Sequence, residues 1–198
     1  MSDYYDPTGR DPSLSRRPMN RRGDDWIRDL LARVQVCRVA TAWDAGQGEH
    51  FPFINPTTFL YRPEAHDIIF HSNIAGRLRA NTEHSDRATI EVSEVGRLLP
   101  SNDPLELSMQ YRSVIVYGRT RLLEDEEARQ ALYQLMARYF PKLRPGVEAC
   151  PIPDGHLART SVYALRVERW SGKENWMERA DQTEDWPPLP AELLEDQA

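Results

Sequence analysis

The chain has 198 residues, of which 40% are hydrophobic and 28% are charged. This length and composition are typical of one globular domain with a full hydrophobic core. The formal net charge of -6 argues against nonspecific nucleic-acid binding, which depends on clustered positive charge. The longest apolar runs are far shorter than a membrane span, so we expect no membrane partner.

The N-terminal region and the two cysteines constrain the protein further. Residues 1–23 are rich in Arg, Asp, Pro, Ser and Gly without periodicity, which predicts an extended arm. They contain no apolar segment of the kind found in secretory signals. Cys37 and Cys150 are isolated in the sequence and fit neither a disulfide framework nor a zinc-ligand pattern. We therefore expect a reduced, cytoplasmic protein without a metal site.

A helix and two strands are predicted after the arm. From Ile27, apolar residues recur at the i, i+3, i+4 and i+7 positions of an amphipathic helix, which the acidic pair at 24–25 begins. Residues 36–42 then predict a strand, residues 44–48 a hairpin loop, and residues 51–61 a second strand. Pro52 and Pro56 interrupt this second strand, and because proline cannot donate to a sheet ladder we expect an edge, a bulge or a bend there.

The segment 68–81 combines a strand with a candidate anion site. It begins as a β-branched and aromatic run, passes through a polar turn that ends at Gly76, and continues into a short helix over 77–83. Backbone N–H groups at a helix N-terminus lack partners, and glycine lets a ligand approach them. Arg77 and Arg79 add forked donors that suit phosphate oxygens. An ordinary corner with solvated arginines is the alternative, since no strict phosphate-binding motif is present.

The second half of the chain predicts three more strands and one more helix. Strands are expected over 88–95, 109–123 and 161–170, and a helix that begins at Asp125 should end at Pro141. Residues 114–117 are apolar at both parities, so we expect both faces of that strand to be covered, one of them by a helix or a second subunit. The connection over 140–158 is long enough for a lid or an interface element.

Six or so closely spaced strands with two or three helices predict a mainly β fold, a small antiparallel barrel with flanking helices. We expect three parts, an extended arm over 1–23, a barrel domain over 24–178, and an acidic tail over 179–198. The chain from Ser171 onward should be packed by its tryptophans.

Four motifs occur in a characteristic order along this domain. They are RVAT at 38–41, FPFINP with two further aromatics at 51–61, FHSN followed by GR at 70–77, and YRSVIVYG at 111–118, and SGKE follows at 171–174. This ordered set resembles the FMN-binding split barrels related to pyridoxamine 5'-phosphate oxidase, and within them the Nim-type 5-nitroimidazole reductases. The resemblance covers roughly residues 20–178.

The resemblance implies a six-stranded antiparallel split β-barrel of the FMN-binding type that forms an obligate homodimer, with two flavin sites at the subunit interface. Carried over by position, Ser72 and Arg77 would hold the FMN phosphate, with His71 beside the flavin. The isoalloxazine would be lined by Arg38, Val39, Ala40, Thr41, Asn55, Pro56, Thr57 and Thr58, with Ser113, Trp170 and Lys173 as further contacts. Many relatives have a phosphate-binding lysine where this chain has Leu78. Either Arg79 substitutes for it or the phosphate site is weaker.

The implied activity is an FMN-dependent oxidoreductase that takes electrons from NAD(P)H and reduces 5-nitroimidazoles or related nitro and quinone-like acceptors. His71 is the candidate catalytic proton donor, with a purely structural hydrogen bond as the alternative. Positive charge from Arg38 or from Lys173 of a second chain would stabilise the reduced flavin. A second hypothesis is a non-catalytic flavin-binding or storage protein, and FAD, heme or the deazaflavin F420 are alternative cofactors for the same pocket.

Overall fold

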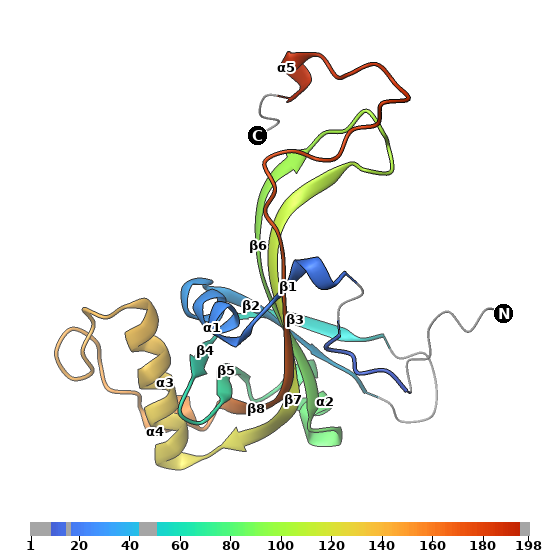
Figure 1. The fold of residues 1–198 in the computed structure, drawn as a ribbon. Coiled ribbons are helices and arrows are strands. Elements are labelled where there is room, and N and C mark those ends of the chain that lie inside the picture. Colours follow the sequence, from blue (N-terminus) through green and yellow to red (C-terminus); the bar gives the residue numbers. More distant parts are fainter. Residues whose placement is uncertain (1–8, 15–16, 44–50, 195–198) are drawn as a thin grey trace.

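The protein is mainly β, and its elements follow the predicted order (Figure 1). A computed structural model describes residues 9–14, 17–43 and 51–194. The helical elements are η1 (Pro18–Asn20), α1 (Asp24–Arg33), α2 (Arg77–His84), α3 (Asp125–Tyr139), α4 (Asp154–Leu157) and α5 (Ala191–Leu194). The strands are β1 (Arg21–Arg22), β2 (Val36–Thr41), β3 (Phe53–Thr58), β4 (Leu60–Arg62), β5 (Asp67–Asn73), β6 (Arg87–Leu99), β7 (Ser108–Leu123) and β8 (Thr160–Asn175).

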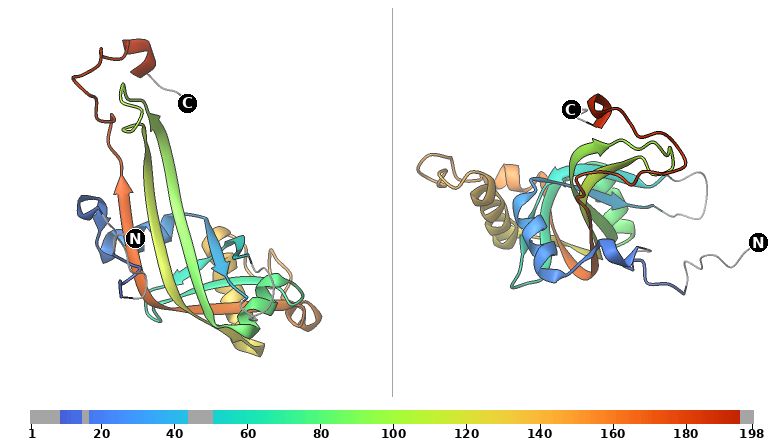
Figure 2. Two further views of the ribbon diagram at one scale, coloured as in Figure 1. Left: turned by 90° about the vertical axis from the view of Figure 1, so that its right-hand side faces the viewer. Right: turned by 45° about the horizontal axis from the view of Figure 1, so that its top comes forward.

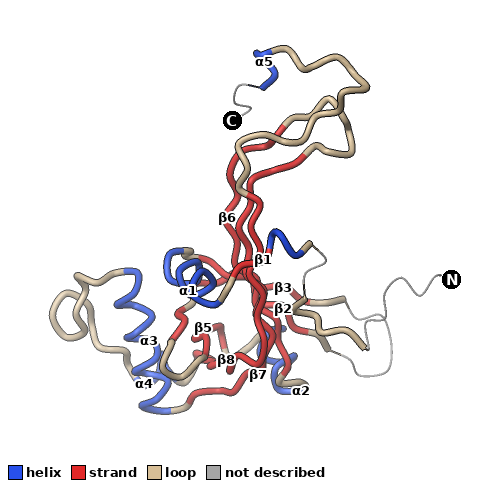
Figure 3. The backbone as a smooth tube through the Cα atoms, viewed as in Figure 1, coloured by secondary structure: helices blue, strands red, loops and turns tan. Residues whose placement is uncertain are grey.

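The strands form one antiparallel sheet that curls into a half-closed barrel with flanking helices. Its order is β3-β2-β6-β7-β8-β5-β4, with β1 paired to β8, so eight strands are described where about six were expected. β3 and β5 approach each other across the open side, where α2 contacts both of them. Figure 3 shows the strands crossing at the centre of the molecule with the helices around them. No helix in the described part of the chain has the length and apolar character needed to span a membrane.

The strand expected over 51–61 is two strands that break at Phe59. This residue is fully buried, and its backbone N–H donates to the Tyr139 hydroxyl of α3 at 3.0 Å instead of to a neighbouring strand. Pro56 lies in β3, which ends the sheet, so its missing N–H leaves no ladder bond unmade. The hairpin loop expected over 44–48 lies outside the described residues.

The core lies between α1 and the inner face of the sheet. Ile27, Leu30 and Leu31 of α1 are buried there, which confirms the amphipathic helix read from their spacing. Gly172 of β8 permits this packing, because a Cβ at its position would lie 2.7 Å from Ile27 Cγ1. A second, smaller apolar cluster lies beneath α3 and includes Ile69 of β5.

Three strands run beyond the barrel as a long arm, which consists of the distal parts of β6, β7 and β8 (Figure 2). At their distal ends β6 and β8 extend well past the predicted Val95 and Trp170, to Leu99 and Asn175, whereas β7 is only one residue longer than predicted, beginning at Ser108. The C-terminal tail is held against the arm by polar contacts, among them the mutual bonds of Asn102 and Thr183 at 2.8 and 3.0 Å. Trp186 is 68% exposed. The Arg112 guanidinium lies 3.9 Å from the Trp176 ring, so the expected packing by tryptophans is found at Trp176 and is wrong for Trp186.

A chain of ion pairs fixes the base of this arm to the barrel. Glu174 of β8 accepts from Arg22 at 2.6 Å and from Arg112 of β7 at 2.7 Å. Glu94 of β6 is shared by Arg33 of α1 at 2.8 Å and by Arg112 at 3.4 Å. The hydrogen bond from Arg33 outweighs burial and lowers the pKa of Glu94. Burial raises the pKa of Glu174, but its arginine partners outweigh that effect and lower it overall.

Candidate functional site

The start of α2 is an open anion site formed by local sequence. Ser72 lies near the end of β5, and Gly76 puts no side chain in front of the helix. No side chain caps α2, and its first turn contains no acidic residue. The helix begins instead with Arg77, so unsatisfied N–H groups and a guanidinium lie together. This combination favours a bound anion such as a phosphate.

A buried asparagine connects this corner to the end of β2. Asn81 of α2 is fully buried, and its Nδ2 donates to Thr41 Oγ1 at 3.0 Å. Its Oδ1 accepts from Arg77 Nε at 3.1 Å. Thr41, one of the residues carried over for the cofactor, thus positions Arg77 through Asn81. The strand, the helix and the guanidinium form one hydrogen-bonded unit.

The two residues that follow Arg77 have different roles. Leu78 is 3% exposed and belongs to the core, so its side chain is not a cofactor contact, and only its backbone N–H, in the first turn of α2, is free to bind an anion. Arg79 donates to Glu83 at 2.6 Å and to the Ser161 hydroxyl at 3.3 Å. Ser161 is the register partner of Ser72. Arg79 therefore lies beside the corner, but Glu83 already compensates its charge.

His71 is half-buried on β5 next to Ser72. Its Nδ1 is buried and has no hydrogen-bond partner among the described residues. Burial lowers the pKa of His71 from its ordinary value of 6.5, so the imidazole is neutral at pH 7. Unpaired buried polar atoms are rare in folded proteins, and a water molecule or a ligand atom is the usual partner of such a nitrogen.

The other carried-over residues of β2 and β3 alternate between the two faces of the sheet. Val39 is buried in the core, and its register partner Asn55 shares that inner face, as do Cys37 and Thr57. Arg38, Ala40, Pro56 and Thr58 lie on the outer face. Arg38 is held there by Glu91 of β6 at 2.9 Å. Along these strands the outer residues can meet a ligand on the open face, and Thr41, which has inner parity, reaches this face only at the end of β2.

Three further predicted cofactor contacts lie in β7 and β8. Ser113 and Lys173 are register partners on the open face, and the Lys173 ammonium lies 5.1 Å from the Tyr111 ring. Trp170 has the opposite parity. Its indole donates to Asp24 at 2.9 Å and its ring packs against Tyr61 at 5.7 Å. Ser113 and Lys173 are thus separated from the corner within one chain, and Trp170 is engaged with α1.

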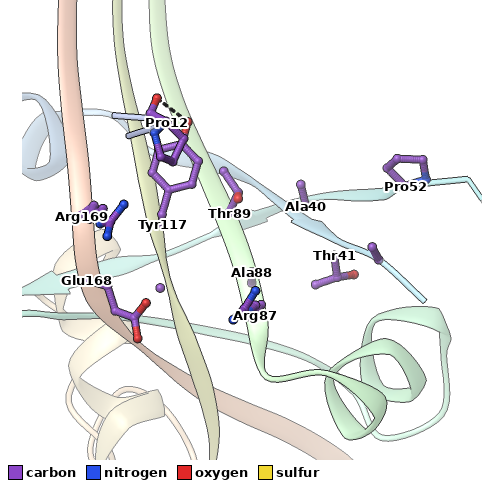
Figure 4. A pocket seen from close by; sticks show the side chains of 12 residues that line it. Pro12, Ala40, Thr41, Pro52, Arg87, Ala88, Thr89, Tyr117, Glu168 and Arg169 are labelled. Carbon is purple, nitrogen blue, oxygen red and sulfur yellow. Dashed lines mark hydrogen bonds between the residues drawn. The ribbon is translucent and has the colours of Figure 1, made fainter. Parts of the chain in front are cut away.

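A pocket of about 580 Å³ opens on the same outer face, next to the corner (Figure 4). Its lining comes from the ends of β2 and the starts of β6, together with β7, β8 and the N-terminal arm: Pro12, Ala40, Thr41, Ala42, Pro52, Arg87, Ala88, Thr89, Tyr117, Gly118, Glu168 and Arg169. Ala40 and Thr41 are the predicted site residues in this lining. The pocket and the anion corner therefore meet at the end of β2.

Sequence reasoning missed most of this lining and also missed Asn81. Asn81 lies mid-helix without a motif, and its partner Thr41 is forty residues earlier. Tyr117 was predicted only to lie in the motif over 111–118 and in a strand that is apolar at both parities, without a role in a site. That pattern did contain a signal: Val114 and Val116 are fully buried, whereas Ile115 and Tyr117 are only half-buried on the open face. In the described part of the chain, no group of three or more His, Cys, Asp or Glu side chains could hold a metal ion.

An antiparallel sheet curled into a split barrel, with an anion corner on its open side, defines a class of cofactor-binding barrels. Residues 24–174 match the family described as Pyridoxamine 5'-phosphate oxidase, and the chain belongs to this family. The predicted split-barrel fold is thereby confirmed. No curated protein matched the chain.

Several solved structures share this fold. A FAD and heme binding protein from Mycobacterium smegmatis has a TM-score of 0.69 at 21% identity, with 82% of this chain and 76% of that one covered. A flavocytochrome from Azotobacter vinelandii has a TM-score of 0.70 at 21% identity, with 87% and 76% covered. A candidate 5-nitroimidazole antibiotic resistance protein from Bacteroides thetaiotaomicron has a TM-score of 0.63 at 21% identity, with 78% and 86% covered.

The residues of the corner fit a flavin phosphate. The uncapped start of α2, with Arg77 and without acidic residues, suits a phosphate. His71 shares the strand parity of Ile69, which packs in the cluster beneath α3, so its side chain lies on the face of β5 opposite Ser72. Of the residues predicted for the phosphate, Ser72 and Arg77 lie at this corner, Arg79 lies beside it, and Leu78 lies in the core.

Proposed function

We propose that the protein binds FMN and acts as an NAD(P)H-dependent oxidoreductase on nitroheteroaromatic compounds, with 5-nitroimidazoles as the substrates to test first. The observation that carries this proposal is the open start of α2, where Arg77 and free N–H groups lie beside Ser72. The family and the flavin-binding proteins among the similar structures support it. The candidate nitroimidazole resistance protein supports the acceptor class.

The chain's own residues would bind and orient the cofactor. Ser72, Arg77 and the first N–H groups of α2 would hold the phosphate, and Asn81 would fix the guanidinium through its bond to Arg77. Ala40, Thr41 and the outward residues of β3 would lie along the ring system. A bound flavin supplies the redox chemistry, accepting a hydride from NAD(P)H and passing an electron pair to an acceptor.

His71 would act as a neutral hydrogen-bonding group at the edge of this site, on the face of β5 opposite Ser72. Because burial lowers its pKa, the imidazole carries one ring proton at pH 7 and is a weak source of a second. It can accept at one ring nitrogen and donate at the other. This state favours positioning and hydrogen bonding over the role of a charged proton donor, and a direct proton transfer would require a raised pKa in the loaded protein.

The open face of the sheet supports a homodimer. Val36 is 42% exposed and Ile54 59% exposed on this face, and Ile115 is half-buried between them and β8. A second copy that covers this face would bury the apolar side chains. It would also bring Ser113 and Lys173 of one copy toward the cofactor of the other, since neither reaches the corner of its own chain.

The test begins with purified protein and FMN. We expect yellow protein after reconstitution, bleaching by NADH or NADPH without oxygen, and recovery of the flavin absorbance on addition of a 5-nitroimidazole. Arg77→Gln should weaken FMN binding by about tenfold, the effect of losing one charge-assisted hydrogen bond. Arg144→Gln is the matched control, because Arg144 is exposed and pairs with Glu148. Failure of FMN and FAD to bind would refute the proposal.

A second candidate is a flavin-binding protein without turnover. Leu78 favours it, because a buried leucine replaces the lysine that relatives use for the phosphate. The FAD and heme binding protein among the similar structures also favours it. A tightly bound flavin that neither NADH nor NADPH reduces would support this candidate over the first.

A further inference from the structure

The pocket next to the anion corner is large enough for a small-molecule ligand of its own. Its volume of about 580 Å³ lies within the range of about 300–1,000 Å³ that is usual for ligand sites. Thr41 lines it and is hydrogen-bonded to Asn81, which in turn holds Arg77. A ligand anchored at the corner can therefore extend into the pocket.

Tyr117 presents an aromatic ring in this pocket (Figure 4). Its hydroxyl donates to the backbone oxygen of Pro12 at 3.3 Å, so the N-terminal arm fixes the ring in place. Thr89, its register partner on β6, and Gly118 complete the floor beside it. A fixed aromatic ring on a pocket wall is a stacking surface for a flat heterocycle.

Two arginines line the pocket with Tyr117. Arg169 is the register partner of Tyr117. Its only ion pair with another described residue is a loose one, at 3.5 Å, with Asp11 of the N-terminal segment. Arg87 has no ion pair within the described part of the chain. Both guanidinium groups are thus available to an anion.

The one carboxylate in the lining, Glu168, is already compensated. Arg119 donates to it at 2.9 Å and is itself held by Asp86 at 2.8 Å. Its charge therefore opposes a bound anion less than an unpaired carboxylate would. The described residues of the pocket lining thus contain one aromatic ring, that of Tyr117, and the two guanidinium groups of Arg87 and Arg169.

We propose that this pocket binds the adenosine phosphate part of a dinucleotide. The base would stack on Tyr117, and Arg169 and Arg87 would bind the phosphate oxygens. FAD and NAD(P)H both contain this group, and either one would place its redox ring on the open face beside Ala40. The link to redox chemistry rests on the proposed function, whereas the binding of adenosine phosphate rests on the pocket alone.

A substitution at Asp11 should strengthen ligand binding, whereas substitutions at Tyr117 or Arg169 should weaken it. The Asp11 carboxylate is the nearest competitor for Arg169, and hydrogen bonds from Ser13 lower its pKa, so it is ionised at neutral pH. Asp11→Asn removes this charge while keeping the shape of the side chain. We expect the variant to bind adenosine phosphates more tightly than the wild-type protein, by about threefold if the exposed pair is of ordinary strength.

The primary experiment is calorimetric titration of the purified, full-length protein with ADP as the probe. We expect Tyr117→Ala to weaken ADP binding by about tenfold or more, from lost base stacking, and Arg169→Gln by about tenfold, from a lost charge-assisted bond. Tyr117→Phe keeps the ring and should bind ADP within about threefold of wild type. Arg166→Gln is the matched control, because Arg166 is exposed on β8 but does not line the pocket. Circular dichroism confirms that each variant is folded.

Two further titrations distinguish the sources of the nucleotide. If FAD is the ligand, Tyr117→Ala weakens FAD binding and leaves FMN binding unchanged. If NAD(P)H is the ligand, the same variant raises the KM for NAD(P)H and leaves the ratio of FAD to FMN affinity unchanged. Absence of ADP binding, or equal binding by wild type and Tyr117→Ala, would overturn the proposal.

The two proposals fail in different ways. ADP binding that depends on Tyr117, in a protein that takes up neither flavin, would refute the proposed function and leave the adenosine site standing. Flavin binding with no effect of Tyr117, Arg169 or Asp11 variants on ADP, FAD or NAD(P)H would refute the adenosine site alone.

Discussion

Asn81 offers the sharpest test of the corner, because a single amide joins β2 to the candidate phosphate site. We expect Asn81→Ala to lower the free energy of unfolding by about 2–4 kcal/mol. About 1–3 kcal/mol comes from leaving the Thr41 hydroxyl buried without a partner, since Thr41 is 4% exposed. A further ~1 kcal/mol comes from the small cavity at a fully buried position. The lost bond to Arg77 adds little to stability, because Arg77 is exposed.

A double-mutant cycle with Thr41→Val separates the orphaned hydroxyl from the cavity. Thr41→Val removes the group that Asn81→Ala would leave without a partner, so the double variant should be more stable than the sum of the two single effects by about 1 kcal/mol or more. Urea unfolding followed by circular dichroism measures the four proteins. Additivity within ~0.3 kcal/mol, or a cost of Asn81→Ala below ~0.5 kcal/mol, would refute this account of the hydrogen bonds.

Asn81→Ala should also change the relative affinities for FMN and riboflavin, which a loss of stability alone would not change. Without Asn81 the Arg77 guanidinium loses the acceptor that orients it, so binding of the phosphate should suffer more than binding of the ring. We expect Asn81→Ala to weaken FMN binding by about five- to tenfold and to leave the affinity for riboflavin, which lacks the phosphate, nearly unchanged. An equal loss for both flavins would contradict the assigned place of the phosphate.

Three further changes test the fold and its titrating groups. Gly118→Ala places a Cβ within 3.0 Å of the Arg166 carbonyl oxygen, which is backbone and cannot yield, so urea unfolding should show a loss of about 3 kcal/mol or more. Burial lowers the folded-state pKa of His71 below 6.5. The contribution of His71 to the free energy of unfolding should therefore be complete above pH 6.5 and be lost as the pH falls through the folded-state pKa. His71→Gln should flatten this part of a plot of unfolding free energy against pH, and an unchanged slope would exclude His71 as its source. Glu174→Gln should cost about 1–3 kcal/mol at pH 7, because its carboxylate joins two arginines and its side chain is 14% exposed. Its lowered pKa means that this difference shrinks as the pH falls below the usual 4.5 and both proteins carry a neutral group, which the same titration checks.

Elements with a strong local signal could be predicted from the sequence. The period of apolar residues from Ile27 gave α1, because a helix face needs no information from distant residues. The turn to Gly76 and the helix after it also follow from short-range preferences. The arginine at the start of α2 was therefore found as a candidate anion ligand before any tertiary contact was known.

Features that depend on tertiary contacts could not be predicted in this way. The distal part of β6 contains glycine and a bulge between Val95 and Leu98, and the end of β8 is polar, so both read as loops. Asn81 becomes important only when α2 meets Thr41 across the barrel. Leu78 looked like a defect in a phosphate site, but the helix turns this position into the core, so its side chain has no access to a ligand.

The open face of β7 connects the two proposals physically. Tyr117 lies four residues beyond Ser113 in one strand, a separation of about 13 Å along it, and both side chains have the parity of the uncovered face. A second copy placed over Ser113 and Lys173 would therefore cover the face next to the Tyr117 pocket. A strand with one buried face needs apolar residues at alternate positions only. Ile115 and Tyr117 lie on the other face, so the packing of the core does not explain them. Ile115 suits a protein interface, and Tyr117, with its hydroxyl fixed by Pro12 and an arginine beside it, suits a flat anionic ligand.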